Sequence, residues 1–231
     1  MNSNIVKIIV LGTLALSVAW HAKAQDAKSP YPSIAPIDQY LMGRDAEIAL
    51  ARSAAPPSIS KDAEVLVFGP HGYETAIKGK NGFACLVERS WTGLNFLGND
   101  PEFWNFKSRF PICYNPTAAR FFVPLTNKKT ELALAGQSEA QIIAGVRAYG
   151  KDGLPPLAPG GMCYMMSKGA YLGDGIDNAP HMMFYVPQGT DWGGGSPGSP
   201  VSQGPRNLAG PPEPVDVFVI LSPKWSDGTP R

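Results

Sequence analysis

Charged residues are scarce in this sequence. Asp, Glu, Lys and Arg make up 17% of its 231 residues, whereas roughly 25% is usual in soluble domains. Twenty basic and nineteen acidic residues give a formal net charge of only +1. Nucleic-acid-binding modules carry a clear basic excess, because they neutralise phosphate groups. The near-neutral composition therefore excludes a nucleic acid as the partner of the chain as a whole.

Histidine is scarcer still. The chain has three histidines, and His21 lies in an N-terminal segment that we expect to be removed, which leaves His71 and His181. No His-Glu-x-x-His or P-loop motif is present, and no Gly-x-Ser-x-Gly elbow or Gly-x-Gly-x-x-Gly turn stands between a strand and a helix. A Ser-His-Asp or Cys-His mechanism would therefore have to use His71 or His181 as its base.

Long apolar runs are missing except at the N-terminus. There Lys7 precedes the apolar stretch 8–20, and Ala22-Lys23-Ala24 fits the small-x-small pattern of a cleavage site. The stretch is shorter than the roughly 20 residues that a spanning helix needs. We therefore expect residues 1–24 to be a cleaved signal peptide and the mature protein to be soluble, secreted or periplasmic, without a membrane span. Cleavage would leave eighteen basic residues against nineteen acidic ones, a net charge of −1.

Cysteine is rare and odd in number. In an oxidising compartment Cys85, Cys113 and Cys163 would form one disulfide and leave one thiol, and three pairings are open. Cys113 precedes a predicted helix N-terminus, where a thiolate would be stabilised. A structural disulfide or an inert thiol is the simpler reading of each.

The first elements of the mature chain are indicated by local patterns. Residues 25–36 contain three prolines and no periodicity, which predicts an extended, flexible leader. Apolar residues at helical spacing predict a helix over about 37–54. A β-branched run predicts a strand at 64–68, followed by strands at 73–79 and 83–91.

The last two of these strands flank Asn81-Gly82, a strong hairpin signal. With a two-residue loop, the register places Glu74 opposite Arg89 and Ile77 opposite Leu86. We therefore predict that these two strands pair directly.

The middle of the chain changes from aromatic to helical. Residues 92–114 carry many aromatic side chains without a period, which predicts a long connection. Asn115-Pro116 is typical of a helix N-terminus, and Pro124 predicts a kink or break in that helix. Ser138, with Gln141 three positions later, predicts a second helix that Gly150 ends.

Three further strands are predicted at 162–167, 181–186 and 215–221. Between the last two, 14 of the 28 residues at 187–214 are Gly or Pro, which predicts a long surface loop. Strands segregated from helices favour an α+β fold. We expect a single domain over 37–231, with a mostly antiparallel sheet of about six strands and three helices.

The candidate catalytic residues are His71 and Glu74. His71 lies in a Gly/Pro-rich turn between two predicted strands, a place that commonly carries function. Glu74 is close enough in sequence to orient its imidazole. The alternative is a solvated turn histidine.

The candidate metal ligands are Cys163, His181 and Met183. Five of the seven methionines lie within the same 22 residues, namely Met162, Met165, Met166, Met182 and Met183. If strands 162–167 and 181–186 pair, Cys163 or Met165 would approach His181 or Met183. Soft sulfur ligands with an imidazole suit copper. Methionine also fills irregular gaps in ordinary cores, so core packing is the alternative.

No complete catalytic arrangement is visible in the sequence. We therefore expect an exported protein that binds a small molecule or a cell-envelope component without catalysis. The aromatic residues of 96–114 would offer a stacking surface for such a ligand. The alternative is that they pack within a long buried connection. The alternative function is that of a hydrolase-like enzyme that uses His71 or a Cys thiol in an unfamiliar arrangement. Apart from the copper candidate, we expect no cofactor.

Overall fold

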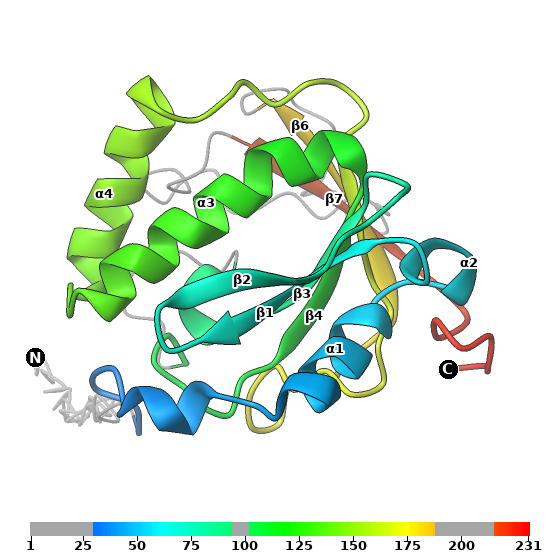
Figure 1. Cartoon of the computed structure of the whole chain (residues 1–231), viewed down its shortest axis with the longest axis horizontal. Coiled ribbons are helices and arrows are strands. Elements are labelled where there is room, and N and C mark those ends of the chain that lie inside the picture. The colour runs from blue at the N-terminus through cyan, green and yellow to red at the C-terminus, as the bar shows by residue number, and fades with distance from the viewer. Residues whose placement is uncertain (1–29, 94–101, 188–214) are drawn as a thin grey trace, which may run out of the picture.

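The described residues form one seven-stranded sheet with helices on both of its faces (Figure 1). The computed structural model describes residues 30–93, 102–187 and 215–231. The spatial order of the strands is β2 (Gly72–Ile77), β1 (Glu64–Gly69), β3 (Ala84–Glu88), β4 (Phe110–Tyr114), β5 (Met162–Met165), β6 (His181–Pro187) and β7 (Val215–Leu221). Only β1 and β3 are parallel neighbours in this sheet, and the other pairs are antiparallel. The predicted α+β class is confirmed.

Three predicted segments fall on undescribed residues. The signal peptide, 1–24, lies outside the described residues, as do positions 25–29 of the leader and 188–214 of the Gly/Pro-rich segment. The described part of the leader contacts the core: the ring of Tyr31 packs edge-on against Phe106, with centroids 5.8 Å apart.

The helices cover the two faces of the sheet unequally. They are η1 (Ile37–Tyr40), α1 (Arg44–Arg52), α2 (Pro57–Ser60), η2 (Ser90–Thr92), α3 (Pro116–Leu134) and α4 (Glu139–Asp152). On one face α1 packs against β1, β3 and β4. On the other, α3 packs against β2 to β5, and α4 packs on α3. No helix of the described residues is long and apolar enough to cross a membrane.

The two faces bury separate apolar clusters because side chains alternate along each strand. In β3, Leu86 belongs to the cluster beneath α3, whereas Cys85 and Val87 belong to the cluster beneath α1. Aromatic rings from the segment before β4, including Phe103 and Trp104, fill the α3 side. The described aromatics of the predicted stacking surface are therefore mainly core residues.

The predicted helix over 37–54 is interrupted. Residues 37–40 form a 3₁₀ turn, and the α-helix begins only at Arg44. The interruption follows from Tyr40, which is fully buried and donates a hydrogen bond of 2.8 Å to the carbonyl of Trp104. Leu41 then takes an extended conformation.

The predicted pairing of 73–79 with 83–91 is wrong. β2 folds back on β1 through the two-residue turn Pro70-His71, which places Glu74 opposite Val67. β3 lies on the other side of β1, parallel to it. Asn81 instead stabilises the connection between β2 and β3, where its amide donates to the carbonyl of Ile59. The Pro70-His71 turn is equally short and comes earlier in the chain, so β2 is already paired with β1 before the Asn-Gly pair is reached.

The two charged residues of that wrong pairing find other partners. Glu74 forms an exposed ion pair with Arg44, 2.6 Å long. Arg89 lies fully buried with Glu47 of α1, 2.9 Å away. The same Glu47 oxygen accepts a hydrogen bond from the amide of Phe68. The guanidinium of Arg89 lies 4.8 Å above the Phe68 ring. This pair fastens α1 to the sheet.

A strand and an unbroken helix replace parts of the predicted middle segment. Residues 110–114 of the expected connection form β4, which brings the six predicted strands to seven. Asn115 caps α3 as predicted, its side chain accepting from the amide of Ala118. The helix then runs through Pro124 without the expected break. Buried Phe121 and Leu125 hold both sides of the proline against the sheet.

The second helix and the C-terminal segment follow local signals. Ser138 and Gln141 form the predicted capping box of α4, although the helix ends at Asp152 and Gly153, not at Gly150. Residues 222–231 cross the sheet edge towards α1. There Ser226 donates from its amide to Met166 and from its hydroxyl to the carbonyl of Ser53.

Candidate functional site

His71 lies at the tip of the β1–β2 turn. Gly69 and Gly72 are paired across this turn, and Gly72 has a φ of 111°, a conformation that only glycine adopts without strain. The His71 side chain is exposed. A rigid two-stranded support therefore presents an accessible imidazole.

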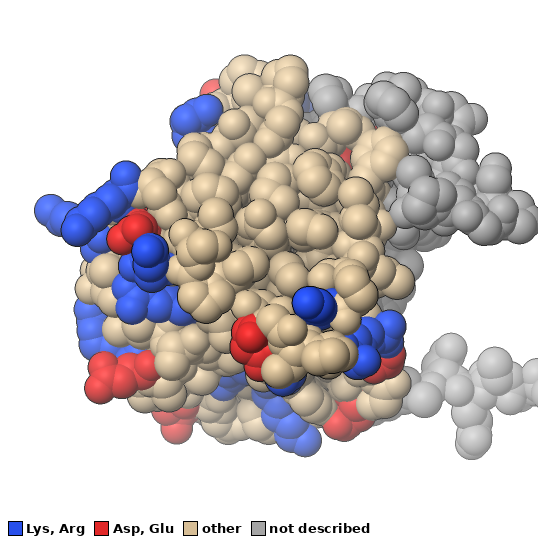
Figure 2. Space-filling model, turned by 90° about the vertical axis from the view of Figure 1, so that its right-hand side faces the viewer, with Lys and Arg blue, Asp and Glu red and all other residues tan. Residues whose placement is uncertain are grey.

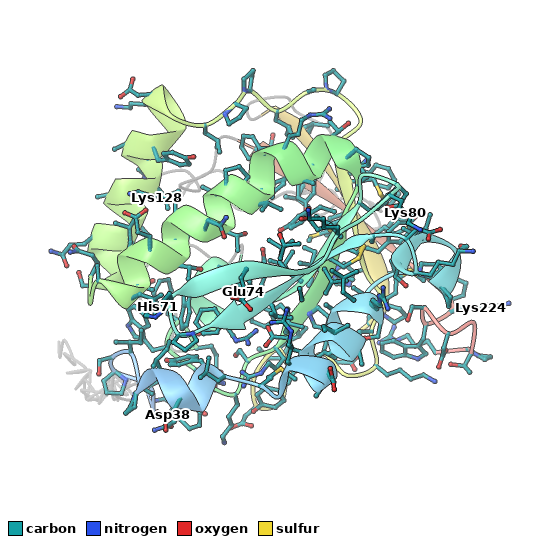
Figure 3. All side chains as sticks on the ribbon, in the orientation of Figure 1. Asp38, His71, Glu74, Lys80, Lys128 and Lys224 are labelled. Carbon is teal, nitrogen blue, oxygen red and sulfur yellow. A yellow bond between two sulfur atoms is a disulfide. The ribbon has the colours of Figure 1, made fainter. Side chains whose placement is uncertain are left out.

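A pocket of about 490 Å³ opens between this turn and the second half of α3. Its walls come from two segments, Pro70, His71, Gly72 and Tyr73 on one side and Asn127, Thr130, Glu131, Leu134 and Ala135 on the other. The α3 residues recur at intervals of three and four, so they line one face of the helix. Figure 3 shows His71 at the turn beneath α3.

The floor and one wall of the pocket are fixed by hydrogen bonds. Thr130 is 1% exposed, and its hydroxyl accepts from the indole of Trp91 at 3.3 Å. The Tyr73 hydroxyl donates to the carbonyl of Val87 at 2.8 Å, which leaves its ring as wall. Burial raises the pKa of this phenol well above its ordinary value. These two groups shape the pocket and stay neutral.

Three polar side chains remain at the pocket surface: His71, Asn127 and Glu131. Glu131 pairs with Lys128 at 2.8 Å, with both groups partly exposed. A surface ion pair of this kind contributes little free energy, so a ligand can replace Lys128 at the carboxylate. The imidazole and the amide each offer a donor and an acceptor. The pocket thus matches a small polar ligand with several hydrogen-bonding groups.

Glu74 does not line this pocket. It lies mid-way along β2 and is bound to Arg44, whereas His71 lies at the end of the strand (Figure 3). The carboxylate that shares the pocket with His71 belongs to Glu131, which sequence reasoning missed. An isolated glutamate on a polar helix face gives no signal of its own, because its approach to His71 depends on how α3 packs.

None of the three cysteines presents an accessible thiol. Cys85 and Cys113 are directly opposite in β3 and β4 and form a disulfide, with Cα atoms 4.0 Å apart. Cys163 is the free one, fully buried, and its sulfur accepts a hydrogen bond from Tyr185 at 3.0 Å. Burial raises the pKa of this thiol to about 12. A thiolate nucleophile is therefore disfavoured at all three positions.

The buried carboxylate of Glu88 is part of a hydrogen-bond network in the core. Glu88, at the end of β3, accepts hydrogen bonds from the Tyr114 and Thr126 hydroxyls at 2.9 and 2.8 Å. Burial, with Glu88 beside it, raises the pKa of the Tyr114 phenol well above its usual range. These contacts join the sheet to α3.

The predicted metal candidates come together on one face of the sheet. β5 and β6 pair so that Cys163 lies opposite Met183 and Met165 lies opposite His181. Within residues 30–93, 102–187 and 215–231, no three His, Cys, Asp or Glu side chains are arranged to hold a metal ion. Any site at this place would therefore depend on methionine sulfur.

Comparisons with protein-family models, curated proteins and solved structures found no match. Functional inference consequently rests on the geometry alone.

Proposed function

We propose that this protein is exported and binds a small polar molecule, or the end of a cell-envelope polymer, in the pocket beside His71. The observation that carries this proposal is the convergence of three accessible polar side chains from two distant segments on one concavity. Such concavities with a few convergent polar groups are the usual form of ligand sites.

Export is supported by two features. The disulfide between Cys85 and Cys113 is of a kind that persists in oxidising compartments. The N-terminal sequence has the pattern of a signal peptide.

Binding is favoured over hydrolysis because the described lining of the pocket lacks the groups that a histidine-based hydrolysis normally uses. A histidine base is normally held by a third group. Glu74, the carboxylate predicted for this role, is paired with Arg44 and lies outside the pocket. The free thiol, Cys163, lies in the core and not in the pocket. The described lining residues include no serine or cysteine, and the hydroxyls of Thr130 and Tyr73 are held by hydrogen bonds to Trp91 and Val87.

The test is a binding screen by NMR on the ¹⁵N-labelled mature protein, using a library of small polar molecules and soluble fragments of envelope polysaccharide. Ligands should shift the amide signals of Gly72, Asn127 and Glu131. Asn127→Ala should weaken binding roughly fivefold to tenfold, because one hydrogen bond contributes about 1 kcal/mol.

The matched control is Glu74→Gln. This carboxylate lies on β2, as the pocket residues Gly72 and Tyr73 do, but outside the pocket. The ligand affinity of this variant should equal that of the wild type. Ligands that shift only residues remote from α3, or that bind Asn127→Ala unchanged, would overturn the proposal. Hydrolysis of a chromogenic ester that is lost in His71→Ala would replace it with the enzyme alternative.

A further inference from the structure

We propose a second, independent site: a copper(I) site formed by the thioethers of Met165 and Met183 and the imidazole of His181, on the α3-side face of β5 and β6. It is separate from the pocket beside His71, and neither site requires the other.

The strand register brings these side chains together. Met165 and His181 are directly opposite, and Met183 follows His181 by two positions on the same face. Met165 and Met183 both pack against the cluster that contains Cys163, whereas the intervening Tyr164 packs against the cluster beneath α1. Opposite Cβ atoms lie about 4.5–5.5 Å apart and diagonal ones about 7–8 Å, which is within reach of two long methionine side chains around one ion.

The imidazole of His181 is set up to coordinate a metal. Its Nδ1 lies 2.7 Å from the carbonyl oxygen of Ala179. Because a carbonyl only accepts hydrogen bonds, this contact favours the neutral tautomer with its proton on Nδ1, in which Nε2 offers its lone pair to a metal. Metal-ligating histidines are typically held by a hydrogen bond of this kind through the other ring nitrogen.

The three proposed ligands differ in how deeply they are buried. His181 and Met165 are half-buried, and Leu221, opposite His181 on β7, is 62% exposed, so an ion has an entry path. Met183 lies deeper, 6% exposed, between Cys163 and Val219. A neutral set of two thioethers and one imidazole against an apolar floor selects a soft monovalent ion over divalent ions that prefer oxygen.

Cys163 contributes packing to this arrangement. Its thiol is fully buried and bound by the hydroxyl of Tyr185. The proposed site holds its ion through neutral donors and needs no thiolate.

The opposite face of the same two strands supplies matched controls. Met162 and Met182 lie on β5 and β6 but point to the other side of the sheet. Replacement of any of these four methionines by leucine removes a sulfur while nearly conserving volume.

The experiment measures copper(I) affinity of the mature protein under ascorbate, in competition with bicinchoninate. We expect one ion per chain, and affinity lowered about tenfold or more in Met165→Leu, Met183→Leu and His181→Asn. Met162→Leu and Met182→Leu should keep the wild-type affinity. No stoichiometric uptake, or equal losses from both faces, would overturn the proposal.

A second measurement on the unmodified protein avoids dependence on variants that fold poorly. Silver(I), a redox-inert stand-in for copper(I), is added to protein labelled with ¹³C at the methionine methyl groups. The signals of Met165 and Met183 should shift and those of Met162 and Met182 should not. Shifts of all four methyl groups, or of none, would contradict the site.

Discussion

The two halves of the sheet are stabilised by different means. In the half from β1 to β4, α1 covers one face and α3 the other, and the buried pair Glu47–Arg89 and the Cys85–Cys113 disulfide join its parts. In the half from β5 to β7, side chains on the face opposite α3 remain partly open, with Phe184 37% and Ile220 46% exposed. Figure 2, which views the molecule from the side that lies to the right in Figure 1, shows a broad central area without charged residues.

The difference indicates where chemistry remains available. In the β1–β4 half, the buried carboxylates Glu47 and Glu88 hold helices to strands, and the accessible polar groups that we propose as a ligand site lie at the rim, beside His71. In the β5–β7 half, sulfur atoms and one imidazole lie together on one face without ionic partners among the described residues. We therefore place the proposed hydrogen-bonding ligand in the first half and the proposed copper(I) ion in the second.

The largest effect is expected at the buried pair. Arg89→Met should lower the free energy of unfolding by about 3–5 kcal/mol, because it leaves the Glu47 carboxylate buried without its partner. Urea denaturation measures this loss. Arg44→Met, which breaks an exposed pair, should cost at most about 1 kcal/mol. Equal losses of stability in the two variants would contradict the distinction between the buried pair and the exposed pair.

The disulfide should come next. Its cysteines are 28 positions apart, and closing a loop of that length stabilises a protein by about 3–4 kcal/mol in the chain-entropy model. The double variant Cys85→Ala/Cys113→Ala should therefore lose that amount in urea or thermal denaturation. Cys163→Ala removes the free cysteine of the other half and keeps the disulfide. A reductant should therefore destabilise Cys163→Ala as it does the wild type, whereas it should leave the stability of the double variant unchanged.

A smaller effect is expected at Tyr73. Tyr73→Phe removes the hydrogen bond to Val87 and should cost about 1 kcal/mol at neutral pH. Burial raises the pKa of the folded phenol well above its ordinary value, whereas the unfolded phenol ionises near pH 10. Through Tyr73 the wild type therefore loses up to about 1.4 kcal/mol per pH unit above pH 10, a contribution that is absent in the variant.

The gap between wild type and Tyr73→Phe should consequently narrow as the pH rises from 9 to 11, in urea titrations at each pH. A gap that stays constant over this range would show that the hydroxyl is not buried.

The smallest effect is expected on the open face of the β5–β7 half. Ile220→Thr should change the free energy of unfolding by no more than about 0.5 kcal/mol, since the side chain is 46% exposed. Chemical denaturation is again sufficient. A loss of 2 kcal/mol or more would mean that this face is covered in solution, and the comparison would need revision.

Local signals in the sequence located most elements. The caps at Asn115 and Ser138 and the β-branched strand at 215–221 occur where their side chains predict, because a cap or an alternating strand depends on neighbours in sequence. β4 was missed because the apolar pattern of 110–114 is short and contains Pro111.

Pairing could not be read in the same way. The Asn-Gly signal was outcompeted by the Pro70-His71 turn, and both hairpins satisfy the same local rules. The sequence leaves three disulfide pairings open, and only the β3–β4 register, with Cys85 opposite Cys113, selects one of them. The pocket joins positions 70–73 to 127–135, so Glu131 became a candidate only once α3 was placed.

The hydroxyl of Ser226 and the carbonyl of Ser53 belong to residues 173 positions apart. Loop closure across that span costs about 1.6 kcal/mol more than across the 28 positions of the disulfide. Contacts of such long range form slowly during folding. The C-terminal segment is thus expected to dock on Met166 and the end of α1 only after the intervening strands have brought these parts of the chain together.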